Sequence, residues 1–448
     1  MAEKNSYDNM EKVIPNISYT VNHSLCTGCG ICEGACPSHA IHMVVRKGRF
    51  IPQIDTSLCK NSKGCHRCYD ACAGLGINLM QIAKGNLYFN DTKHDDYIGN
   101  YISCHTGYST DEYIRYHSAS GGMVSQMLIW LLGKGYIQGA VVTKFDPDNE
   151  LLVNSFVATT KDDILVAKSS KYSPVTLNTA IQEIKKREGK YVIVGLPCHI
   201  QGFRKYEQLD KSFKEKIFGY FGIYCSCGRS FYLTEYAFRE RRIDKSRLTY
   251  FAYRDEGCLG SMVVRQRPTG IRIANSYSET CLYKEDEVYK DRYQNYYHPL
   301  RTFFVPQRCH FCIDHYAELA DVSFGDIHVM PYKEDKIGIS SWVIRNEMFC
   351  ALFDDAKKDG AIVMDDLDVP VLKASQKVAF HKKKRSATYF KIHRLFGLKV
   401  PKYDVTLHDD NAFKSVISYF NQMVQGFIGR RKYLWWIINP LKMTPPKD

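Results

Sequence analysis

Eight cysteines near the N-terminus form two runs of four whose spacing suits metal-cluster chemistry. The first run follows C-x2-C-x2-C-x3-C-P and consists of Cys26, Cys29, Cys32 and Cys36. The second run also closes on C-x2-C-x3-C and consists of Cys59, Cys65, Cys68 and Cys72. Thiolates at these intervals can bind cubane 4Fe–4S clusters, which transfer single electrons. The pattern therefore predicts redox chemistry.

The two runs form an internal repeat, because Ser24-Leu25 before the first run recurs as Ser57-Leu58 before the second. In bacterial-type ferredoxins with two clusters, the last cysteine of each run binds the other cluster. Applied here, one cluster takes Cys26, Cys29, Cys32 and Cys72, and the other takes Cys36, Cys59, Cys65 and Cys68. The second run departs from the ferredoxin pattern, since five residues separate its first two cysteines and Ala73 replaces the usual proline.

Zinc sites and disulfides are the alternatives for so many cysteines. Zinc sites usually pair two C-x2-C units across a spacer, which fits a duplicated C-x2-C-x3-C frame poorly. Disulfides need an oxidising compartment, whereas the polar N-terminus lacks the apolar segment of a secretory signal. No apolar stretch approaches the roughly 20 residues that span a bilayer. We therefore expect a cytoplasmic protein with two ferredoxin-type 4Fe–4S clusters.

At 448 residues the chain is too long to be a ferredoxin alone. Its length suggests two or three domains, and its 45% hydrophobic content is ordinary for a globular protein. We expect an α+β protein with a bacterial ferredoxin-like domain over residues 1–90. A mixed α/β domain over 91–372 and a basic, helical C-terminal extension over 373–448 follow.

The central region begins with a Ser/Gly segment before a predicted helix. Ser118-Ala119-Ser120-Gly121-Gly122 precedes apolar residues at helical spacing over 123–131. Strands are predicted over 139–143 and 151–159. Ser and Gly before a helix offer free amides to an anion, and they also serve as a simple helix cap. Both interpretations stay open.

Two single cysteines follow predicted buried strands. The strand at 191–194 comes just before Cys198, after a polar helix over 180–188, and the strand at 217–224 ends at Cys225. Strand–helix–strand units form parallel sheets with right-handed crossovers, so the carboxyl ends of their strands lie along one edge. We therefore expect Cys198 and Cys225 to lie close together.

A last C-x2-C pair consists of Cys309 and Cys312. Together with Cys198 and Cys225 it makes a plausible third four-thiolate site. The alternative is that the two single cysteines are small buried residues, as free cysteine often is.

Several short segments in fixed order resemble one family, the beta subunit of the coenzyme F420-reducing hydrogenase and of F420-linked formate dehydrogenase. Its relatives include the input subunit of the F420H2 dehydrogenase and plant 7-hydroxymethyl chlorophyll a reductase. The resemblance covers about residues 20–350. It rests on Ser118–Gly122, Ser170-Lys171-Tyr172, Gly195–His199, Cys225, Arg254-Asp255, Arg308–Cys312 and Ala320–Asp326.

The resemblance implies a flavin-binding central domain, with FAD and a third 4Fe–4S cluster beside it. The family's cluster ligands fall on Cys198, Cys225, Cys309 and Cys312, and Cys227 has no counterpart, so we treat it as a spare thiol. Its flavin-lining positions fall on Ser118, Ser120, Gly121, Gly122 and Lys171. Lys171 is the candidate catalytic residue, since its charge could steady the reduced flavin or the phosphates. The alternative is an exposed, solvated lysine.

A flavin also fits the chemistry, because clusters pass single electrons whereas deazaflavins and nicotinamides accept hydride. No G-x-G-x-x-G follows a strand, so no Rossmann fingerprint for a nicotinamide is visible. We expect an oxidoreductase that exchanges electrons with ferredoxin or another redox protein. Its small-molecule hydride acceptor is coenzyme F420 in the family, or alternatively an intermediate of cell-surface polysaccharide synthesis.

The net charge of +13 is concentrated near the C-terminus. Residues 373–402 contain ten Lys or Arg and no Asp or Glu, including the block Lys382-Lys383-Lys384-Arg385. Such a block favours acidic partners, which could be anionic substrate tails, an acidic ferredoxin or anionic lipid. The alternative is a solvated basic surface.

Residues 413–431 have helical apolar spacing, and clustered aromatics follow at 433–438 behind Arg430-Arg431-Lys432. This combination suits peripheral membrane contact, a partner groove or an intramolecular docking helix, and we favour docking or a partner. A non-catalytic iron–sulfur protein that binds nucleic acid is the remaining alternative. No RRM, KH or zinc-finger signature is present, so we expect no nucleic-acid partner.

Overall fold

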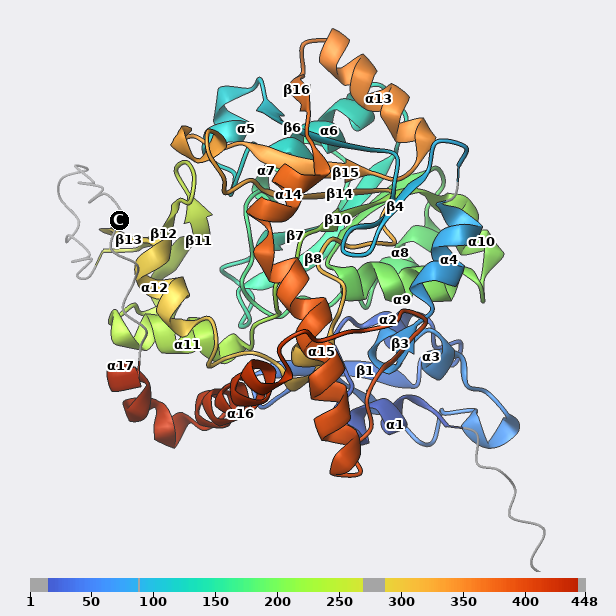
Figure 1. Cartoon of the computed structure of the whole chain (residues 1–448). Helices are drawn as coiled ribbons and strands as arrows, with labels where there is room; N and C mark the ends of the chain where they lie inside the picture. Colours follow the sequence, from blue (N-terminus) through green and yellow to red (C-terminus); the bar gives the residue numbers. More distant parts are fainter. Residues whose placement is uncertain (1–14, 88, 269–286, 442–448) are drawn as a thin grey trace, which may run out of the picture.

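An eight-stranded mixed sheet lies at the centre of the chain (Figure 1). The computed structural model describes residues 15–87, 89–268 and 287–441. The strand order is β16-β6-β15-β14-β10-β9-β7-β8. The bounds are β6 (Ser103–Ser109), β7 (Gly139–Phe145), β8 (Val153–Ala158), β9 (Tyr191–Gly195), β10 (Ile217–Ile223), β14 (Val322–Asp326), β15 (Ser340–Ile344) and β16 (Ile362–Asp366).

The middle strands β14, β10, β9 and β7 run parallel, and the outer strands run antiparallel to their neighbours. Because successive strand residues point to opposite faces, Ile193 and Tyr220 pack on one side of the sheet, and Val192 and Phe221 pack on the other. Both faces are therefore covered, which explains why β9 and β10 are apolar along their whole length.

Helices cover the two faces of this sheet. One face packs against α6 (Met123–Gly133), α7 (Lys161–Val166) and α13 (Glu347–Lys358). The other packs against α8 (Ala180–Lys186), α9 (Pro197–Glu207) and α10 (Lys211–Lys216). In Figure 1 the first set lies above the sheet and the second below it. The N-terminal unit lies beneath the second set.

The N-terminal unit wraps both cysteine runs in short elements around one β-hairpin. Its strands β1 and β2 pair antiparallel, with Lys47 and Gly48 at positive φ in the turn between them. Its elements are α1 (Ile17–Asn22), α2 (Ile31–Gly34), β1 (Ile41–Arg46), β2 (Arg49–Ile54), η1 (Asn61–Lys63), α3 (Arg67–Asp70), η2 (Ala73–Leu75), β3 (Gly76–Ile77) and α4 (Leu79–Asn86).

This unit packs tightly on the central domain. The amide of Leu177 donates to the carbonyl oxygen of Cys29 at 2.9 Å. Gly30 has φ +84°, and a Cβ added there would lie 2.1 Å from Thr176 Oγ1. Lys205 on α9 donates from Nζ to the carbonyl oxygen of Cys72 at 2.8 Å. The backbone of both cysteine runs is thus held against the loop before α8 and against α9.

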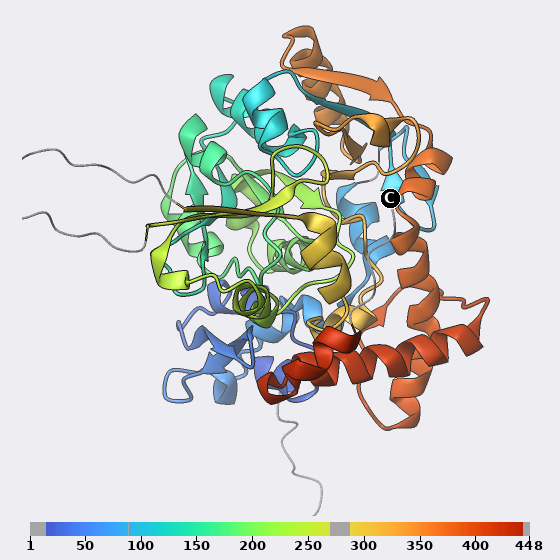
Figure 2. The same cartoon turned by 90° about the vertical axis from the view of Figure 1, so that its left-hand side faces the viewer.

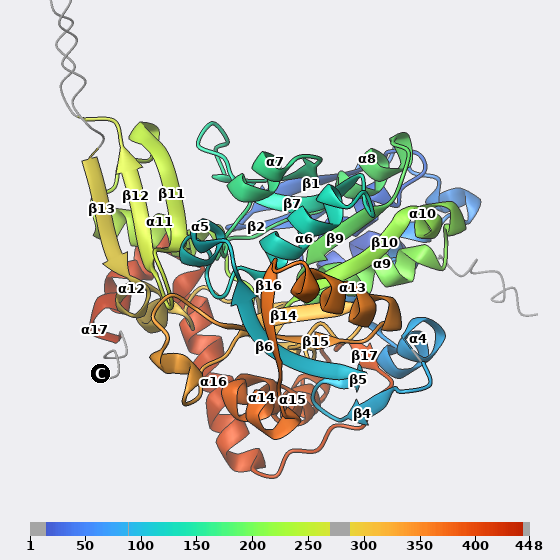
Figure 3. The same cartoon turned by 90° about the horizontal axis from the view of Figure 1, so that it is seen from above.

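A second, three-stranded sheet stands at one side of the molecule (Figure 3). It contains β11 (Leu248–Asp255), β12 (Ser261–Gln266) and β13 (Glu287–Arg292), and it packs with α11 (Phe231–Glu240) and α12 (Tyr293–Leu300). The remaining short elements before the C-terminal region are β4 (Lys93–Asp95), β5 (Gly99–Tyr101), α5 (Glu112–Tyr116), η3 (Lys245–Arg247), η4 (Gln307–Phe311) and η5 (Tyr332–Glu334).

The C-terminal region is mainly helical and returns to the N-terminal unit (Figure 2). Strand β17 pairs parallel with β3. No helix in the described residues is both long and apolar enough to cross a membrane. The elements are α14 (Val369–Ser375), α15 (Lys377–Leu395), β17 (Lys402–Tyr403), α16 (Ala412–Gly429), η6 (Lys432–Ile437) and α17 (Ile438–Leu441).

The predicted elements of the central region are confirmed, with small shifts at their ends. The helix over 123–131 is α6, and the strands over 139–143, 191–194 and 217–224 are β7, β9 and β10. The strand predicted over 151–159 starts only at Val153. Leu152 has φ +62°, which is incompatible with an extended strand, and the amide of Leu151 donates to Asn149 Oδ1 at 2.8 Å. These two residues therefore finish a turn.

The close approach at Gly30 predicts that alanine lowers the thermal stability more there than at Gly135, which has a similar φ. Gly135 has φ +76°, but nothing lies within 4 Å of its added Cβ. Gly135→Ala should cost only the left-handed strain, about 1–2 kcal/mol. Gly30→Ala adds a clash with Thr176 and Asn178, so its thermal unfolding midpoint should fall further. Equal midpoints in anaerobic differential scanning fluorimetry would contradict tight packing at this interface.

Candidate functional site

The first predicted ligand set lies together in the N-terminal unit. Cys26, Cys29, Cys32 and Cys72 are all buried. Burial, and then the neighbouring Cys72 and Cys29, raise the pKa of Cys26 to about 12. The pKa of Cys32 is also raised, by burial and then by Cys29, Cys26 and Cys72. Such mutual effects indicate that the four thiols lie near one another.

The second predicted set is grouped in the same way but lies closer to solvent. Burial raises the pKa of Cys68 to about 11, and Cys36, Cys65 and Cys59 contribute in the same direction. Cys59 and Cys65 are half-buried, whereas Cys36 and Cys68 are buried. This set is therefore the more accessible of the two.

The surroundings of both sets suit thiolate ligands. The amide of Ala40 donates to Cys36 Sγ at 3.3 Å. Burial raises the pKa of Cys26 and Cys29, and backbone amides of Gly28 and Ile31 offset part of this rise. Amide donors favour the thiolate, and hydrogen bonds to sulfur tune iron–sulfur clusters. Every cysteine of both sets is a free thiol. In the part of the chain that the structure describes, no group of His, Cys, Asp or Glu is tight enough to surround a single metal ion.

The third predicted set is also brought together, from three separate elements. Cys198 lies in the first turn of α9, Cys225 follows β10, and Cys309 and Cys312 lie in and just after η4. The pKa of Cys198 is raised well above its usual value by burial, then by Cys29 and by these three thiols. As the strand order predicted, β9 and β10 are parallel neighbours.

Cys227 belongs to this neighbourhood, although the sequence interpretation treated it as a spare thiol. After burial, it is the thiol that most raises the pKa of Cys309, and it also raises the pKa of Cys225. The thiols that most raise the pKa of Cys198, after burial, are instead Cys29, Cys225, Cys309 and Cys312. The fifth thiol therefore lies on the Cys309 side of the group. Its place just after Cys225 and Ser226 was the only signal in the sequence.

The first and third sets are neighbours. Cys29 of the N-terminal unit raises the pKa of Cys198 more than any thiol of the third set does. The Cys29–Leu177 hydrogen bond holds the two loops in contact. Cys68 of the second set in turn raises the pKa of Cys32 of the first, after burial and the thiols of the first set itself. The thiol groups thus form a series from the second set through the first to the third, which lies within the central domain.

The C-terminal region contributes a cation to the third set. Lys382 on α15 is buried, and its Nζ donates to the carbonyl oxygens of Cys225 at 3.0 Å and Asp314 at 2.9 Å. Cys312 Sγ donates to the same Asp314 oxygen at 3.4 Å. Lys383, also buried, pairs with Glu318 at 2.7 Å. The basic block is therefore not uniformly solvated, because two of its lysines point into the protein.

The predicted flavin positions Ser118, Ser120, Gly121 and Gly122 form the turn before α6. Gly122, at φ +77°, caps the helix without a side-chain hydrogen bond. A Cβ on Gly121 would lie 2.6 Å from the carbonyl oxygen of Gly107, so only glycine fits there. Ser120 Oγ donates to the carbonyl oxygen of Ile339 at 2.7 Å. Ser118 Oγ is buried without a partner, and such an orphaned group fits a bound ligand.

Lys171 has a half-buried side chain whose ammonium group faces backbone carbonyls. Its Nζ donates to the carbonyl oxygens of Lys168 at 2.7 Å and Ser169 at 3.1 Å. Burial, and then the charge of Lys168, lower its pKa to about 7. The alternative of an exposed, solvated lysine is therefore wrong.

Arg254 connects Lys171 with the Ser/Gly turn. Its guanidinium donates to the carbonyl oxygen of Ala119 and, at 2.8 Å, to Asp326. Its own carbonyl oxygen accepts from Ser169 Oγ. Burial alone would raise the pKa of Asp326, but Arg254 holds it well below its usual range. The residues that the resemblance selected on three segments are thus physically linked.

Aromatic rings lie between this site and the third thiol set. Tyr172, next to Lys171, lies 4.2 Å from Tyr297 between ring centroids. The guanidinium of Arg229 lies over Tyr297, 5.0 Å from its centroid. Cys227 raises the pKa of Arg229 and of Tyr297, after the larger effects of burial and other neighbours. The two sites are therefore in contact through side chains.

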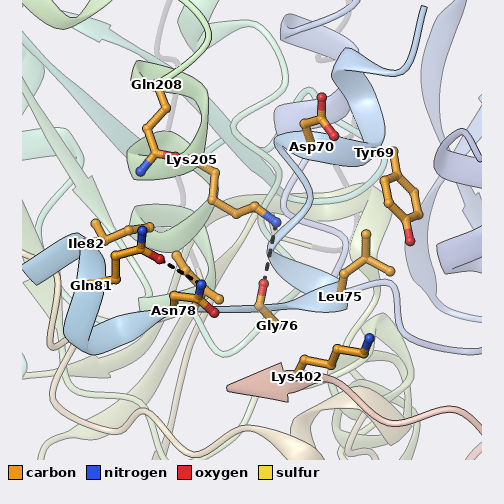
Figure 4. A pocket seen from close by; sticks show the side chains of 11 residues that line it. Tyr69, Asp70, Leu75, Gly76, Asn78, Gln81, Ile82, Lys205, Gln208 and Lys402 are labelled. Atoms are coloured by element: carbon orange, nitrogen blue, oxygen red, sulfur yellow. Dashed lines mark hydrogen bonds between the residues drawn. The ribbon is translucent and has the colours of Figure 1, made fainter. Parts of the chain in front are cut away.

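A cavity of about 390 Å³ lies elsewhere, where α4 and α9 meet the β3–β17 pair (Figure 4). Lys205 and Lys402 line it, and Figure 4 shows Lys205 pointing toward the carbonyl oxygen of Gly76. Asn78 donates to Gln81 at 2.8 Å on its wall. The cavity borders the N-terminal unit and none of the predicted flavin positions.

Comparison with known protein families gives three matches. The C-terminal part of the coenzyme F420 hydrogenase/dehydrogenase beta subunit matches residues 188–369. The N-terminal part of the same beta subunit matches residues 104–182. A 4Fe-4S binding domain matches residues 19–42.

Individual proteins give the same picture. The chain is 21% identical to the coenzyme F420 hydrogenase subunit beta of Methanosarcina barkeri, over 68% of this chain and 96% of that protein. It is 23% identical to a subunit of the F(420)H(2) dehydrogenase of Methanosarcina mazei, over 84% and 94%. In fold it resembles a chain of the F420-reducing [NiFe] hydrogenase complex from Methanosarcina barkeri. That match has a TM-score of 0.52 and 21% identity, and it covers 69% of this chain and 98% of that one.

The placement of Cys225 and Cys227 predicts different outcomes for two serine variants. Cys225→Ser should lose one cluster, about four iron atoms per chain, because Cys225 faces Cys198, Cys309 and Cys312. Cys227→Ser, which removes an equal thiol two residues away, should keep its iron. Iron and sulfide analysis of anaerobically purified protein would check this. If only Cys227→Ser loses iron, Cys227 is the cluster ligand and Cys225 is the spare thiol.

Lys382 should raise the reduction potential of the third site, because its positive charge stabilises the more negative reduced state. At about 6 Å and an effective dielectric constant of 20, one charge contributes about 2.8 kcal/mol, or on the order of 100 mV. Lys382→Met should therefore lower one midpoint potential in an EPR-monitored titration. Lys384→Met is the matched control, since Lys384 pairs with Asp410 instead. Equal potentials in both variants would contradict this role.

Proposed function

The chain belongs to the family of coenzyme F420 hydrogenase/dehydrogenase beta subunits, and on this premise we propose that it is an iron–sulfur flavoprotein oxidoreductase. Its relatives support an oxidoreductase with an iron–sulfur domain. In our proposal, electrons pass between a redox partner and a hydride-accepting substrate through two N-terminal 4Fe–4S clusters, a third cluster and FAD.

The observation that carries this proposal is the serial contact of the three thiol groups. The second set is half-open to solvent at Cys59 and Cys65, which suits exchange with ferredoxin or another redox protein. The first set is buried, and its Cys29 adjoins Cys198 of the third. Electrons that enter at the surface would thus have a continuous route into the central domain.

FAD would be held by the turn before α6 and by Lys171. Ser118 Oγ is a buried hydroxyl without a hydrogen-bond partner. The first amides of the 11-residue helix α6 can donate hydrogen bonds to an anionic group. Lys171 and Arg254 supply positive charge on the other side of the turn, where phosphates or a reduced flavin would carry negative charge. When bound, FAD supplies the exchange between single electrons and hydride.

Coenzyme F420 is the hydride carrier that we propose for this site. Several relatives bear its name, including the hydrogenase beta subunits and an F420-dependent sulfite reductase of Methanocaldococcus jannaschii. The cationic surroundings formed by Lys171 and Arg254 suit a negatively charged deazaflavin.

Cofactor extraction after anaerobic purification tests the flavin directly. We expect close to one FAD per chain, and reduction of the clusters and flavin by F420H2 or by reduced ferredoxin. If extraction releases no flavin, the protein is an iron–sulfur electron carrier and the flavoprotein proposal is wrong. If the protein contains flavin but only NAD(P)H reduces it, the flavoprotein proposal holds and the proposal of F420 as substrate is wrong.

Lys171 should contribute to flavin binding by charge. Lys171→Met removes the ammonium group and its hydrogen bonds, and a charge-assisted hydrogen bond contributes about 1.5–3 kcal/mol. FAD affinity should therefore fall at least tenfold, as measured by fluorescence during flavin reconstitution. Lys161→Met, at an exposed position on α7, is the control and should bind FAD normally. Lys171→Arg should recover part of the affinity, and equal affinity in all variants would contradict this role.

A further inference from the structure

One face of α16 is apolar and uncovered. Phe413, Ile417, Phe420, Val424 and Phe427 recur at intervals of four and three, which places them on one side of the helix. All five are exposed, with exposed fractions from 46% for Phe427 to 78% for Phe413. The opposite side of α16 packs against the protein core, where Tyr419 is buried and Val416 and Met423 are partly buried. The helix therefore docks within the protein and still presents a second apolar face.

The segment that carries this face holds positive charge only, with Asp410 just before it and Glu235 paired with Lys432. Residues 411–447 contain no Asp or Glu. The described cations of this segment are Lys414, Arg430, Arg431 and Lys432. The guanidinium of Arg431 lies over the ring of Phe427, 3.4 Å from its centroid. The pKa of Arg430 is lowered by burial, then by the charge of Arg49 and then by that of Arg431. The positive charges of these residues therefore lie close together.

Two amphipathic aromatic residues extend the face beyond α16. Tyr433 and Trp436 are 71% and 70% exposed, whereas Trp435 between them is buried against α11. Residues three apart in a 3₁₀ segment lie on the same side, so both rings project away from the core. Tyr and Trp are enriched where apolar and aqueous surroundings meet.

The end of α15 repeats this composition. Leu395 is 85% exposed, and Phe396 and Leu398 are exposed beside it. The cations in this tip are Lys391, Arg394 and Lys399, and all three are exposed. Figures 1 and 2 both show this tip and α16 along the lower edge of the molecule. The two elements protrude together from one side.

We propose that this lower edge, formed by the exposed face of α16, Tyr433, Trp436 and the tip of α15, binds a lipid bilayer with anionic headgroups. The apolar side chains would enter the interface, and the cations would contact the headgroups, each contributing close to a fivefold gain in binding. Because no described helix is long and apolar enough to span a bilayer, the contact is peripheral.

A second copy of the chain fits this face poorly. Two such faces in contact would bring Lys414, Arg430 and Arg431 against their own counterparts, with no carboxylate in the segment to compensate. A groove on an acidic protein would take one protruding element, whereas a bilayer meets both at once. The proposal does not depend on the cofactors or on the substrate.

Vesicle flotation with the intact, cluster-loaded protein tests the proposal. We expect binding to vesicles that contain phosphatidylglycerol and phosphatidylcholine, and at least fivefold less to phosphatidylcholine alone. Binding should weaken as salt is raised, because exposed charges are screened. The variant with Ile417→Glu and Val424→Glu should lose at least tenfold in bound fraction.

A charge-matched control distinguishes the effect of the α16 face from the effect of the change in net charge. Val166→Glu with Val288→Glu also adds two carboxylates, at positions whose exposed fractions of 56% and 55% match the 57% of Val424 and the 55% of Ile417. This control should float like the wild type, and both variants should keep the cluster absorbance. The proposal is overturned by equal binding of the two variants or by no binding of the wild type to anionic vesicles. A wild-type dimer that the α16 variant dissociates would overturn it as well.

Discussion

The contact between the Cys29 loop and the segment before α8 is the constraint on which the rest of the structure depends. Electron transfer needs redox centres at a fixed, short separation, and here the two neighbouring thiol groups belong to different parts of the chain. One backbone hydrogen bond, from Leu177 to Cys29, and one glycine without space for a Cβ bring them together. Lys205 reinforces the contact by binding the backbone of Cys72. The N-terminal unit is thus fixed to the central domain at its own ligand loops.

The C-terminal region completes this arrangement. Helix α15 inserts Lys382 and Lys383 beside Cys225 and Glu318, and β17 adds a strand to β3 of the N-terminal unit. Burial disfavours the charge of Lys382, and negative charge on Cys312, Cys225, Cys227 and Asp314 outweighs that effect and raises its pKa. Lys382 and the third thiol set therefore explain each other's presence in the interior.

The sequence predicted what is encoded locally. The spacing of the cysteine runs, the apolar period of α6 and the buried strands β9 and β10 depend on near neighbours, and the crossover rule then brought Cys198 and Cys225 together. Two features escaped prediction because they depend on tertiary packing. The run Lys382–Arg385 is indistinguishable in sequence from a solvated basic helix, and only the packing of α15 shows which lysines turn inward. Cys227 follows Cys225 after one residue, but only the fold shows that it also lies near Cys309, which comes from a separate element.

The order in which the chain supplies these parts has a consequence for biosynthesis. Every cysteine of the two N-terminal sets has been made once residue 72 leaves the ribosome, so those sites can receive iron while translation continues. The third set waits for Cys312, and its enclosing cation waits for α15. The order of synthesis therefore allows the N-terminal sites to be filled first and the site in the central domain to be enclosed last.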